Sequence, residues 1–199
     1  MTTSTTGWSL LLPETWHRVR LDENRRQQVT SVVGKAFATV SRDESASARR
    51  SLENDLAGLV DRAHDGGGRE FYLLMDVLRG IPLAATLVVT VVPEPVPADV
   101  APEILARVLA NDPNSEPAVL EVAGENVPAV RRSEAKIMRE EIPGLGPARL
   151  TFTGLDVFVP FPDRSQILLL TFRTPMEPIA ASMMVLFEAV AGSLRWREA

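Results

Sequence analysis

The sequence contains no cysteine and has only two lysines and two histidines. The lack of cysteine excludes disulfides, thiolate nucleophiles and cysteine-bound metals. A zinc site made from histidines and carboxylates typically uses a spacing such as H-E-x-x-H, which is also absent. The glycine-rich residues 66–68 and 144–146 lack the lysine of a P-loop and the strand-to-helix context of a dinucleotide site. We therefore expect no metal and no other cofactor.

Basic residues are scarce relative to acidic ones. The chain has 21 lysines and arginines against 26 aspartates and glutamates, which gives a formal net charge of −5. A protein that binds nucleic acid gains much of its affinity from basic residues that displace counterions from phosphates. This balance argues against nucleic acid as a partner.

Long apolar runs are missing as well. The longest, residues 81–92, is interrupted by Pro82 and two threonines. It is shorter than the roughly 20 residues that a membrane-spanning helix needs. The first residues carry no positive charge, so we expect no signal peptide. The sequence thus predicts a cytoplasmic protein that does not insert into a membrane.

The residues that are present fit an ordinary globular domain. The chain has 199 residues, of which 45% are hydrophobic and 24% charged, and both fractions are usual for a folded protein. We expect a flexible tail over residues 1–7 and one domain over residues 8–199.

Hydrophobic periodicity predicts the elements of this domain. The predicted strands cover residues 8–12, 16–21, 71–78, 81–92, 118–122, 127–132, 150–159 and 166–173. Four helices are predicted. The first follows Asp22, the second ends before Gly66, the third follows Asp99, and the fourth runs from Pro178 to Trp196. Because hairpin-length links dominate, we predict an α/β fold of the α+β type, with helices packed against a mostly antiparallel sheet. At Gly154 the alternation slips by one residue, which predicts a β-bulge.

Two carboxylates lie inside otherwise apolar strands, those of Asp76 and Asp156. A carboxylate that pointed inward would be desolvated and would mark a functional site. The alternation of side chains along a strand predicts instead that both face solvent. Arg131 and Arg173, which also lie in predicted strands, could pair with them across the sheet.

Asp61, His64 and Asp65 gather where a helix is predicted to end. They could carry a proton or hold a metal. They could equally form a solvated helix terminus, where the helix dipole favours a positively charged histidine. We expect the solvated terminus.

Aromatic residues lie near the predicted ends of several elements, and Trp196 is one of them. Such residues either form a contact surface or close the edges of a core, and we favour a role in a single core. The candidate contacts for a partner or ligand are Trp8, Trp16, Asp76, Arg131, Asp156, Phe158, Phe161 and Arg173.

The two ends of the chain resemble PsbP-like domains. Residues 7–16, GWSLLLPETW, combine a strand, a proline and a tryptophan-led second strand. Residues 186–196, LFEAVAGSLRW, run from a phenylalanine-led helix to a serine and a large apolar residue. The resemblance implies a PsbP-like fold and a binding or assembly role, and it transfers no catalytic residue. The arginine-rich, lysine-poor usage is similar to that of actinobacterial proteins, some of which are associated with type VII secretion loci.

Two hypotheses about function follow. The first, which we favour, is a non-catalytic protein-binding or assembly factor, with type VII secretion as the setting that the resemblance implies. The alternative is a small-ligand-binding protein or an enzyme with a pocket between sheet and helices, which would use Asp76 or Asp156 with an arginine. A homodimer formed through an exposed strand edge is compatible with both.

Overall fold

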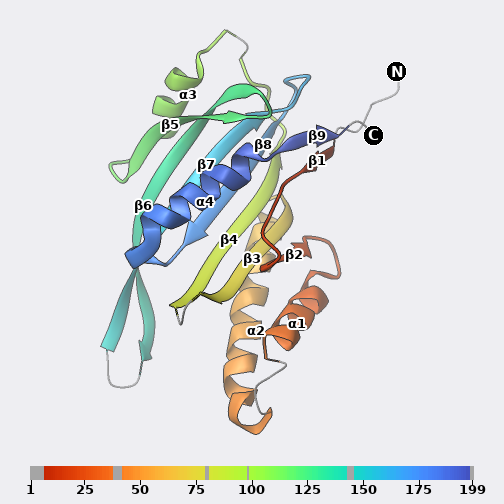
Figure 1. Cartoon of the computed structure of the whole chain (residues 1–199), viewed down its shortest axis with the longest axis vertical. Helices are drawn as coiled ribbons and strands as arrows, with labels where there is room; N and C mark the ends of the chain where they lie inside the picture. Colours follow the sequence, from red (N-terminus) through yellow and green to blue (C-terminus); the bar gives the residue numbers. More distant parts are fainter. Residues whose placement is uncertain (1–6, 38–41, 79–80, 98, 143–145, 198–199) are drawn as a thin grey trace.

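The computed structural model describes residues 7–37, 42–78, 81–97, 99–142 and 146–197. The strands are β1 (Gly7–Ser9), β2 (Trp16–Arg20), β3 (Gly68–Leu78), β4 (Ile81–Val92), β5 (Ser115–Val122), β6 (Glu125–Ile142), β7 (Gly146–Pro160), β8 (Ile167–Thr174) and β9 (Arg195–Arg197). Seven of them form an antiparallel sheet in the order β2-β3-β4-β8-β7-β6-β5, and β1 pairs with β9 in a separate two-stranded sheet (Figure 1). The predicted α+β fold with a mostly antiparallel sheet is confirmed.

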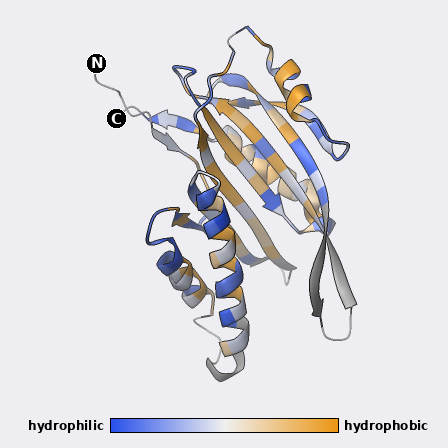
Figure 2. Cartoon of the chain, turned by 180° about the vertical axis from the view of Figure 1, so that it is seen from behind, coloured by the Kyte–Doolittle hydropathy of each residue, from blue (hydrophilic) through white to orange (hydrophobic). Residues whose placement is uncertain are grey.

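Helices cover the two faces of the large sheet differently. They are α1 (Arg25–Ala36), α2 (Arg42–Asp65), α3 (Pro102–Leu109) and α4 (Ala180–Gly192), with a 3-10 turn η1 (Glu177–Ile179) before α4. On one face α4 contacts β5, β7 and β8 (Figure 1). On the other face α1 and α2 pack on β2 and β3, while α3 packs on β5 and β6 (Figure 2). In the described part of the chain, no helix is long and apolar enough to cross a membrane.

Buried side chains form two clusters, one on each face of the large sheet. In the cluster under α4, the ring of Phe172 stacks on that of Phe187 at a centroid distance of 5.0 Å. In the cluster under α1 and α2, Val33 packs with Phe71 of β3. Successive residues of β3 contribute to opposite clusters, since side chains alternate along a strand. The single core that we expected is therefore divided between the two faces.

Some backbone groups at the outer edges of the large sheet are already paired, and one N–H is missing. At β2, the side-chain amide of Gln28 accepts the Arg20 N–H at 2.9 Å and donates to the Arg20 carbonyl at 3.3 Å. The N–H of Trp16 donates to the carbonyl of Pro13 at 3.0 Å. At the opposite edge, Pro117 of β5 has no N–H to donate. These features disfavour pairing of two copies along β2 or β5, and the homodimer stays a prediction.

Strand β6 is longer than its sequence pattern suggested. It continues past the predicted end at Arg132 to Ile142, where it pairs with β7. Its pairing with β5 ends at Arg132, so the two strands β6 and β7 continue as a ribbon beyond the sheet (Figure 1).

The two ends of the chain also differ from the prediction. The last helix ends at Gly192, and Trp196 lies in β9, where it is the register partner of Trp8. The Trp196 ring also packs against Phe161 at a centroid distance of 4.9 Å. These long-range contacts override the helical pattern. Of the predicted tail, residues 1–6 lie outside the described residues and Gly7 begins β1.

Asp61 joins the two helices on the second face. Its carboxylate accepts the Nε hydrogens of Arg25 at 2.8 Å and Arg26 at 2.9 Å. It therefore faces α1 rather than His64, whose Nδ1 lies 3.0 Å from Asp65 at the exposed end of α2. Among the described residues, no group of three or more His, Cys, Asp or Glu residues could hold a metal ion.

This ion pairing gives the α1–α2 contact a pH dependence. The hydrogen bond from Arg26, followed by that from Arg25, holds the pKa of Asp61 below its usual 3.8. A carboxylate with a lowered folded-state pKa stabilises the fold above its usual pKa, and this contribution is lost as the pH falls through the lowered value. We expect Asp61→Asn to lower the melting temperature at pH 7 and at pH 5, with a difference from the parent that shrinks below pH 4.

Thermal unfolding followed by circular dichroism at several pH values measures this difference. Asp55→Asn, at an exposed position on the same helix, is the matched control and should leave the melting temperature unchanged. A difference for Asp61→Asn that grew on acidification would contradict the role given to this carboxylate.

Candidate functional site

The middle of the large sheet presents one face that no described helix crosses (Figure 2). On this side α1, α2 and α3 make their main sheet contacts with the outer strands, and β4, β8 and β7 lie between them. We call this surface the open face. It consists of Thr86, Val88, Thr90, Gly154, Asp156, Phe158, Ile167, Leu169, Thr171 and Arg173, which the strand registers place on the same side. Apart from the buried Gly154 and Asp156, these residues are half-buried.

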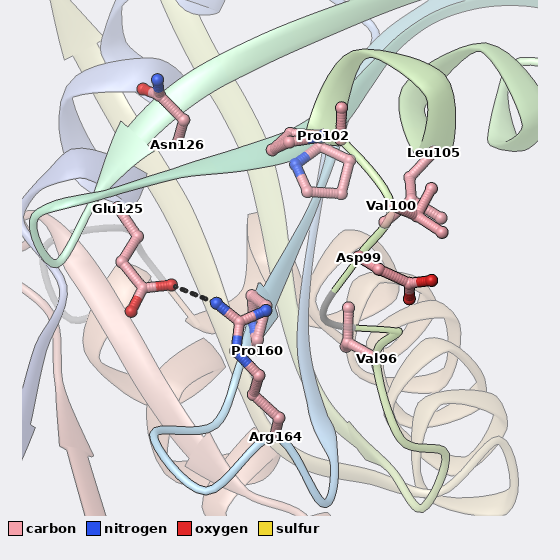
Figure 3. A pocket seen from close by; sticks show the side chains of 11 residues that line it. Val96, Asp99, Val100, Pro102, Leu105, Glu125, Asn126, Pro160 and Arg164 are labelled. Carbon is pink, nitrogen blue, oxygen red and sulfur yellow. Dashed lines mark hydrogen bonds and ion pairs between the residues drawn. The ribbon is translucent and has the colours of Figure 1, made fainter.

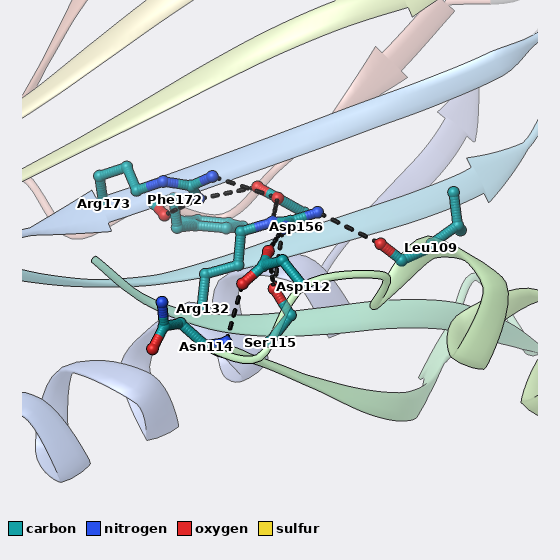
Figure 4. A network of polar contacts seen from close by, with 8 residues as sticks. All are labelled: Leu109, Asp112, Asn114, Ser115, Arg132, Asp156, Phe172 and Arg173. Carbon is teal, nitrogen blue, oxygen red and sulfur yellow. Dashed lines mark hydrogen bonds and ion pairs between the residues drawn. The ribbon is translucent and has the colours of Figure 1, made fainter.

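Asp156 lies near the centre of the open face and is only 6% exposed. Arg173 of β8 donates from Nη1 to Oδ1 at 2.7 Å and from Nη2 to Oδ2 at 3.1 Å. From β6, Arg132 donates from Nε to Oδ2 at 2.6 Å (Figure 4). Removing a carboxylate from water is costly unless its charge is compensated and its lone pairs accept hydrogen bonds. The two guanidinium groups meet both needs.

Arg132 extends these contacts to the segment between α3 and β5. Its Nη1 donates to Asp112 at 2.9 Å and to the Ser115 hydroxyl at 2.8 Å, and its Nη2 donates to the Leu109 carbonyl at 3.4 Å. Hydrogen bonds from Ser115 and from the Asn114 N–H hold the pKa of Asp112 below its usual value, and the charge of Arg132 adds to this effect. We call the connected side chains the charge cluster, which comprises Asp112, Ser115, Arg132, Asp156 and Arg173 (Figure 4).

Gly154 leaves room for the charge cluster. It lies in register between Arg132 of β6 and Arg173 of β8. A Cβ atom at this position would lie 2.6 Å from Cδ and Nη1 of Arg173 and 2.6 Å from the Phe172 carbonyl oxygen. The arginine can therefore lie flat across the strand only over a glycine. The predicted β-bulge is wrong, because the pairing of β7 with both neighbours continues through this residue without a shift.

Of the four charged residues predicted as contacts, Asp156 and Arg173 lie together, whereas Asp76 and Arg131 lie on the other side of the sheet. The expected pairing of Arg173 with Asp156 is present, but the prediction that Asp156 faces solvent is wrong. Arg131 points to the side of α4, where it donates to Glu188 at 2.7 Å. The alternation along β3 places Asp76 on that side too, so it does not belong to the charge cluster.

Sequence reasoning missed Arg132, which makes the most contacts within the charge cluster. The alternation of side chains could have indicated it. Val127 and Ala129 are apolar and lie under α4, so Arg131, two positions further, points to the same side and Arg132 points to the other. Its pairing with Asp156 depends on the register of β6 against β7, which the sequence pattern does not give.

Of the predicted aromatic contacts, Phe158 is the one on the open face. Trp16 and Phe161 are buried in the cluster under α4, and Trp8 packs against that cluster. These three close the edge of a core, as we expected of them. Phe158 is half-buried and belongs to neither cluster.

Two kinds of groups therefore meet on the open face. Arg173 uses Nη1 for Asp156 and for the Phe172 carbonyl and one Nη2 hydrogen for Asp156. A guanidinium has five N–H hydrogens, so the Nε hydrogen and one Nη2 hydrogen are not engaged by described residues. Beside it lie the hydroxyls of Thr86 and Thr171, and farther along lies the apolar pair Phe158 and Leu169.

Comparison with known proteins shows a distant structural likeness. No family model matches the sequence, and no curated protein matches it. The fold is similar to the crystal structure of LpqN, a protein involved in cell envelope biogenesis of Mycobacterium tuberculosis. The two chains are 9% identical, the match covers 98% of this chain and 86% of LpqN, and the TM-score is 0.44. The PsbP-like resemblance stays a prediction.

Replacing Arg132 tests whether the charge cluster supports the fold. We expect Arg132→Ala to lower the free energy of unfolding by about 2–3 kcal/mol, because it leaves a buried carboxylate with one partner. Arg131→Ala is the matched control. Its ion pair with Glu188 has side chains 42% and 30% exposed, and such a pair contributes less than about 1 kcal/mol. Urea unfolding of both variants measures the difference, and equal losses would contradict the assigned role.

A second prediction concerns Gly154. We expect Gly154→Ala to cost about 1–3 kcal/mol, because the added Cβ overlaps both Arg173 and a backbone carbonyl. Gly58→Ala in α2 is the control, because its Cβ would meet only the end of Arg62 at 3.4 Å. Alanine in a helix is favoured over glycine by up to about 1 kcal/mol, so this variant should be at least as stable as the parent. A Gly154→Ala protein with unchanged urea midpoint would refute the close-approach explanation.

Proposed function

We propose that this chain is a non-catalytic binding protein that holds a segment of a protein partner on the open face. The observation that carries the proposal is the half-burial of Phe158, Ile167 and Leu169, which belong to neither core cluster. A sheet face that is simply solvated normally alternates to polar residues. Apolar side chains left in the middle of a sheet are typical of a surface that a partner covers.

The apolar side chains are grouped rather than scattered. Phe158 and Leu169 are register partners on β7 and β8, and Ile167 is the partner of Pro160 at the next position on the same side. Together they form one end of the open face. An apolar side chain of the partner would be buried here, where each buried methylene contributes about 0.8 kcal/mol.

The other end of the open face offers hydrogen-bond donors. Arg173 is held in place by Asp156, and its side chain is 29% exposed. Its orientation is fixed before a partner arrives, so less conformational freedom is lost on binding. A carbonyl or carboxylate of the partner segment would accept from its unengaged N–H hydrogens, which gives the segment a direction along the sheet.

The groups that reach the open face favour binding over catalysis. Asp156 is engaged by two arginines, and Asp112 by Arg132 and Ser115, so their carboxylates serve the charge cluster. The remaining side chains are hydroxyls and apolar groups. A role in type VII secretion and a cytoplasmic location remain predictions from the sequence.

Site-specific photo-crosslinking in cells that naturally produce the chain tests the proposal. One variant carries p-benzoylphenylalanine in place of Leu169 on the open face. A matched variant carries it in place of Val185, which is 67% exposed on the outer side of α4. We expect an adduct of defined mass from position 169 but not from position 185, because the partner would contact only the open face.

A further substitution makes the crosslinking specific. Phe158→Ser removes the ring that faces position 169 across β7 and β8, and it should reduce the adduct by at least about fivefold, since about 1 kcal/mol of binding energy is lost. No adduct from position 169, or equal adducts from positions 169 and 185, would count against the open face as the binding surface.

A further inference from the structure

A hollow of about 300 Å³ lies where α3 begins, between the linker that follows β4 and the turns that join β5 to β6 and β7 to β8 (Figure 3). Its volume is at the lower end of the range for small-molecule sites, which suits one long side chain. Pro160 lines it, and the register partner of Pro160 is Ile167 of the open face. The hollow therefore adjoins the apolar end of the open face.

The walls of the hollow are largely apolar and held in place by backbone contacts. Val96, Val100, Pro102 and Leu105 line it together with Pro160. The linker is fixed to the opposite turn, because the N–H of Val96 donates to the carbonyl of residue 164 at 3.3 Å. Proline has a fixed φ angle and loses little freedom on folding. The walls thus exist before a ligand enters.

The charged groups that line the hollow carry an excess of negative charge. Arg164 donates to Glu125 at 3.4 Å, and both side chains are well exposed, at 43% and 60%. Asp99 also lines the hollow and, within the described residues, has no hydrogen bond or ion pair. One guanidinium and two carboxylates give the lining a net charge of −1, in a chain whose own net charge is −5.

We infer that the hollow binds the side chain of an arginine or lysine of the partner segment. This inference rests on the proposed function, because the segment would lie on the open face and insert the side chain at its apolar end. The aliphatic stem would pack on Val96, Val100 and Pro102, as long basic side chains do on apolar surfaces. The cationic head would pair with one of the two carboxylates of the lining, Asp99 or Glu125, which lie on opposite sides of Arg164 in Figure 3.

The resident guanidinium of Arg164 does not prevent this. A long contact between two exposed side chains contributes little, so Glu125 can exchange Arg164 for an incoming cation at low cost. An anion, in contrast, would meet two carboxylates with one guanidinium already engaged. The net charge of the ionised side chains that line the hollow therefore favours a cation over an anion.

The direct test is a titration of the ¹⁵N-labelled chain, followed by amide chemical shifts, with N-acetyl-arginine amide as the probe. N-acetyl-citrulline amide has nearly the same shape without the charge, and N-acetyl-glutamate amide reverses the charge. We expect saturable shifts at residues 96, 100, 125 and 164 with the arginine probe. The citrulline probe should bind about three- to tenfold more weakly, and the glutamate probe should cause no saturable shifts there.

Two variants test whether this binding depends on the carboxylate of Asp99. Asp99→Asn should weaken the binding of the arginine probe by about three- to tenfold without changing the melting temperature, because Asp99 is exposed and forms no hydrogen bond or ion pair with the described residues. Glu116→Gln, which removes an equal charge at an exposed position of β5 outside the hollow, is the control and should leave affinity unchanged. Equal binding of arginine and citrulline probes, tighter binding of the glutamate probe, or equal effects of the two variants would overturn the inference.

The outcome can be separated from that of the proposed function. If crosslinking from position 169 succeeds and the arginine probe does not bind, the open face is retained and the hollow is rejected as an anchor site. If the probe binds and no adduct forms at position 169, the hollow is a site for free cations and its link to a partner segment is rejected.

Discussion

The charge of Asp156 is the constraint on which the open face depends. Asp156 is 6% exposed and lies on a part of the sheet that has no helix above it in the described chain. Its charge must therefore be balanced by side chains that lie along the sheet. Arg132 and Arg173 do this from the neighbouring strands, and Gly154 gives Arg173 the space to lie flat. The cluster thus joins several strands and leaves the surface above them open.

The two faces of the sheet consequently have different characters. One is closed by α4, which packs on residues such as Phe172, and carries the larger core cluster. The other is covered only at its ends, by α1 and α2 on one side and α3 on the other. In our account the uncovered middle and the hollow beside α3 form one surface, with donors at Arg173, apolar groups around Leu169 and carboxylates at Asp99. This order of donors, apolar groups and negative charge would fix both the position and the direction of a bound segment.

Local sequence patterns predicted much of this architecture. The features that they did not predict depend on pairing between residues far apart in the sequence. Alternation and turn residues identified most strands and placed Asp156 and Arg173 in neighbouring ones. The pattern did not show that Asp156 is buried, because alternation tells which side of a strand a residue takes but not what lies on that side. The pair of Arg132 and Asp156 is separated by 24 positions and depends on a strand register. The predicted end of α4 was wrong for the same reason, because Trp196 pairs in β9 with Trp8 from the other end of the chain.

The central claim is that the middle of the second sheet face is open to solvent in the free protein. Three consecutive leucines of β8 test it directly, because Leu168 and Leu170 are 0% exposed under α4 while Leu169 is half-buried on the open face. Methyl NMR with a soluble paramagnetic gadolinium chelate measures their accessibility. We expect strong relaxation enhancement of the Leu169 methyl groups and little for its two neighbours. Protection of Leu169 equal to that of Leu168 and Leu170 would show that this face is covered and would contradict the account.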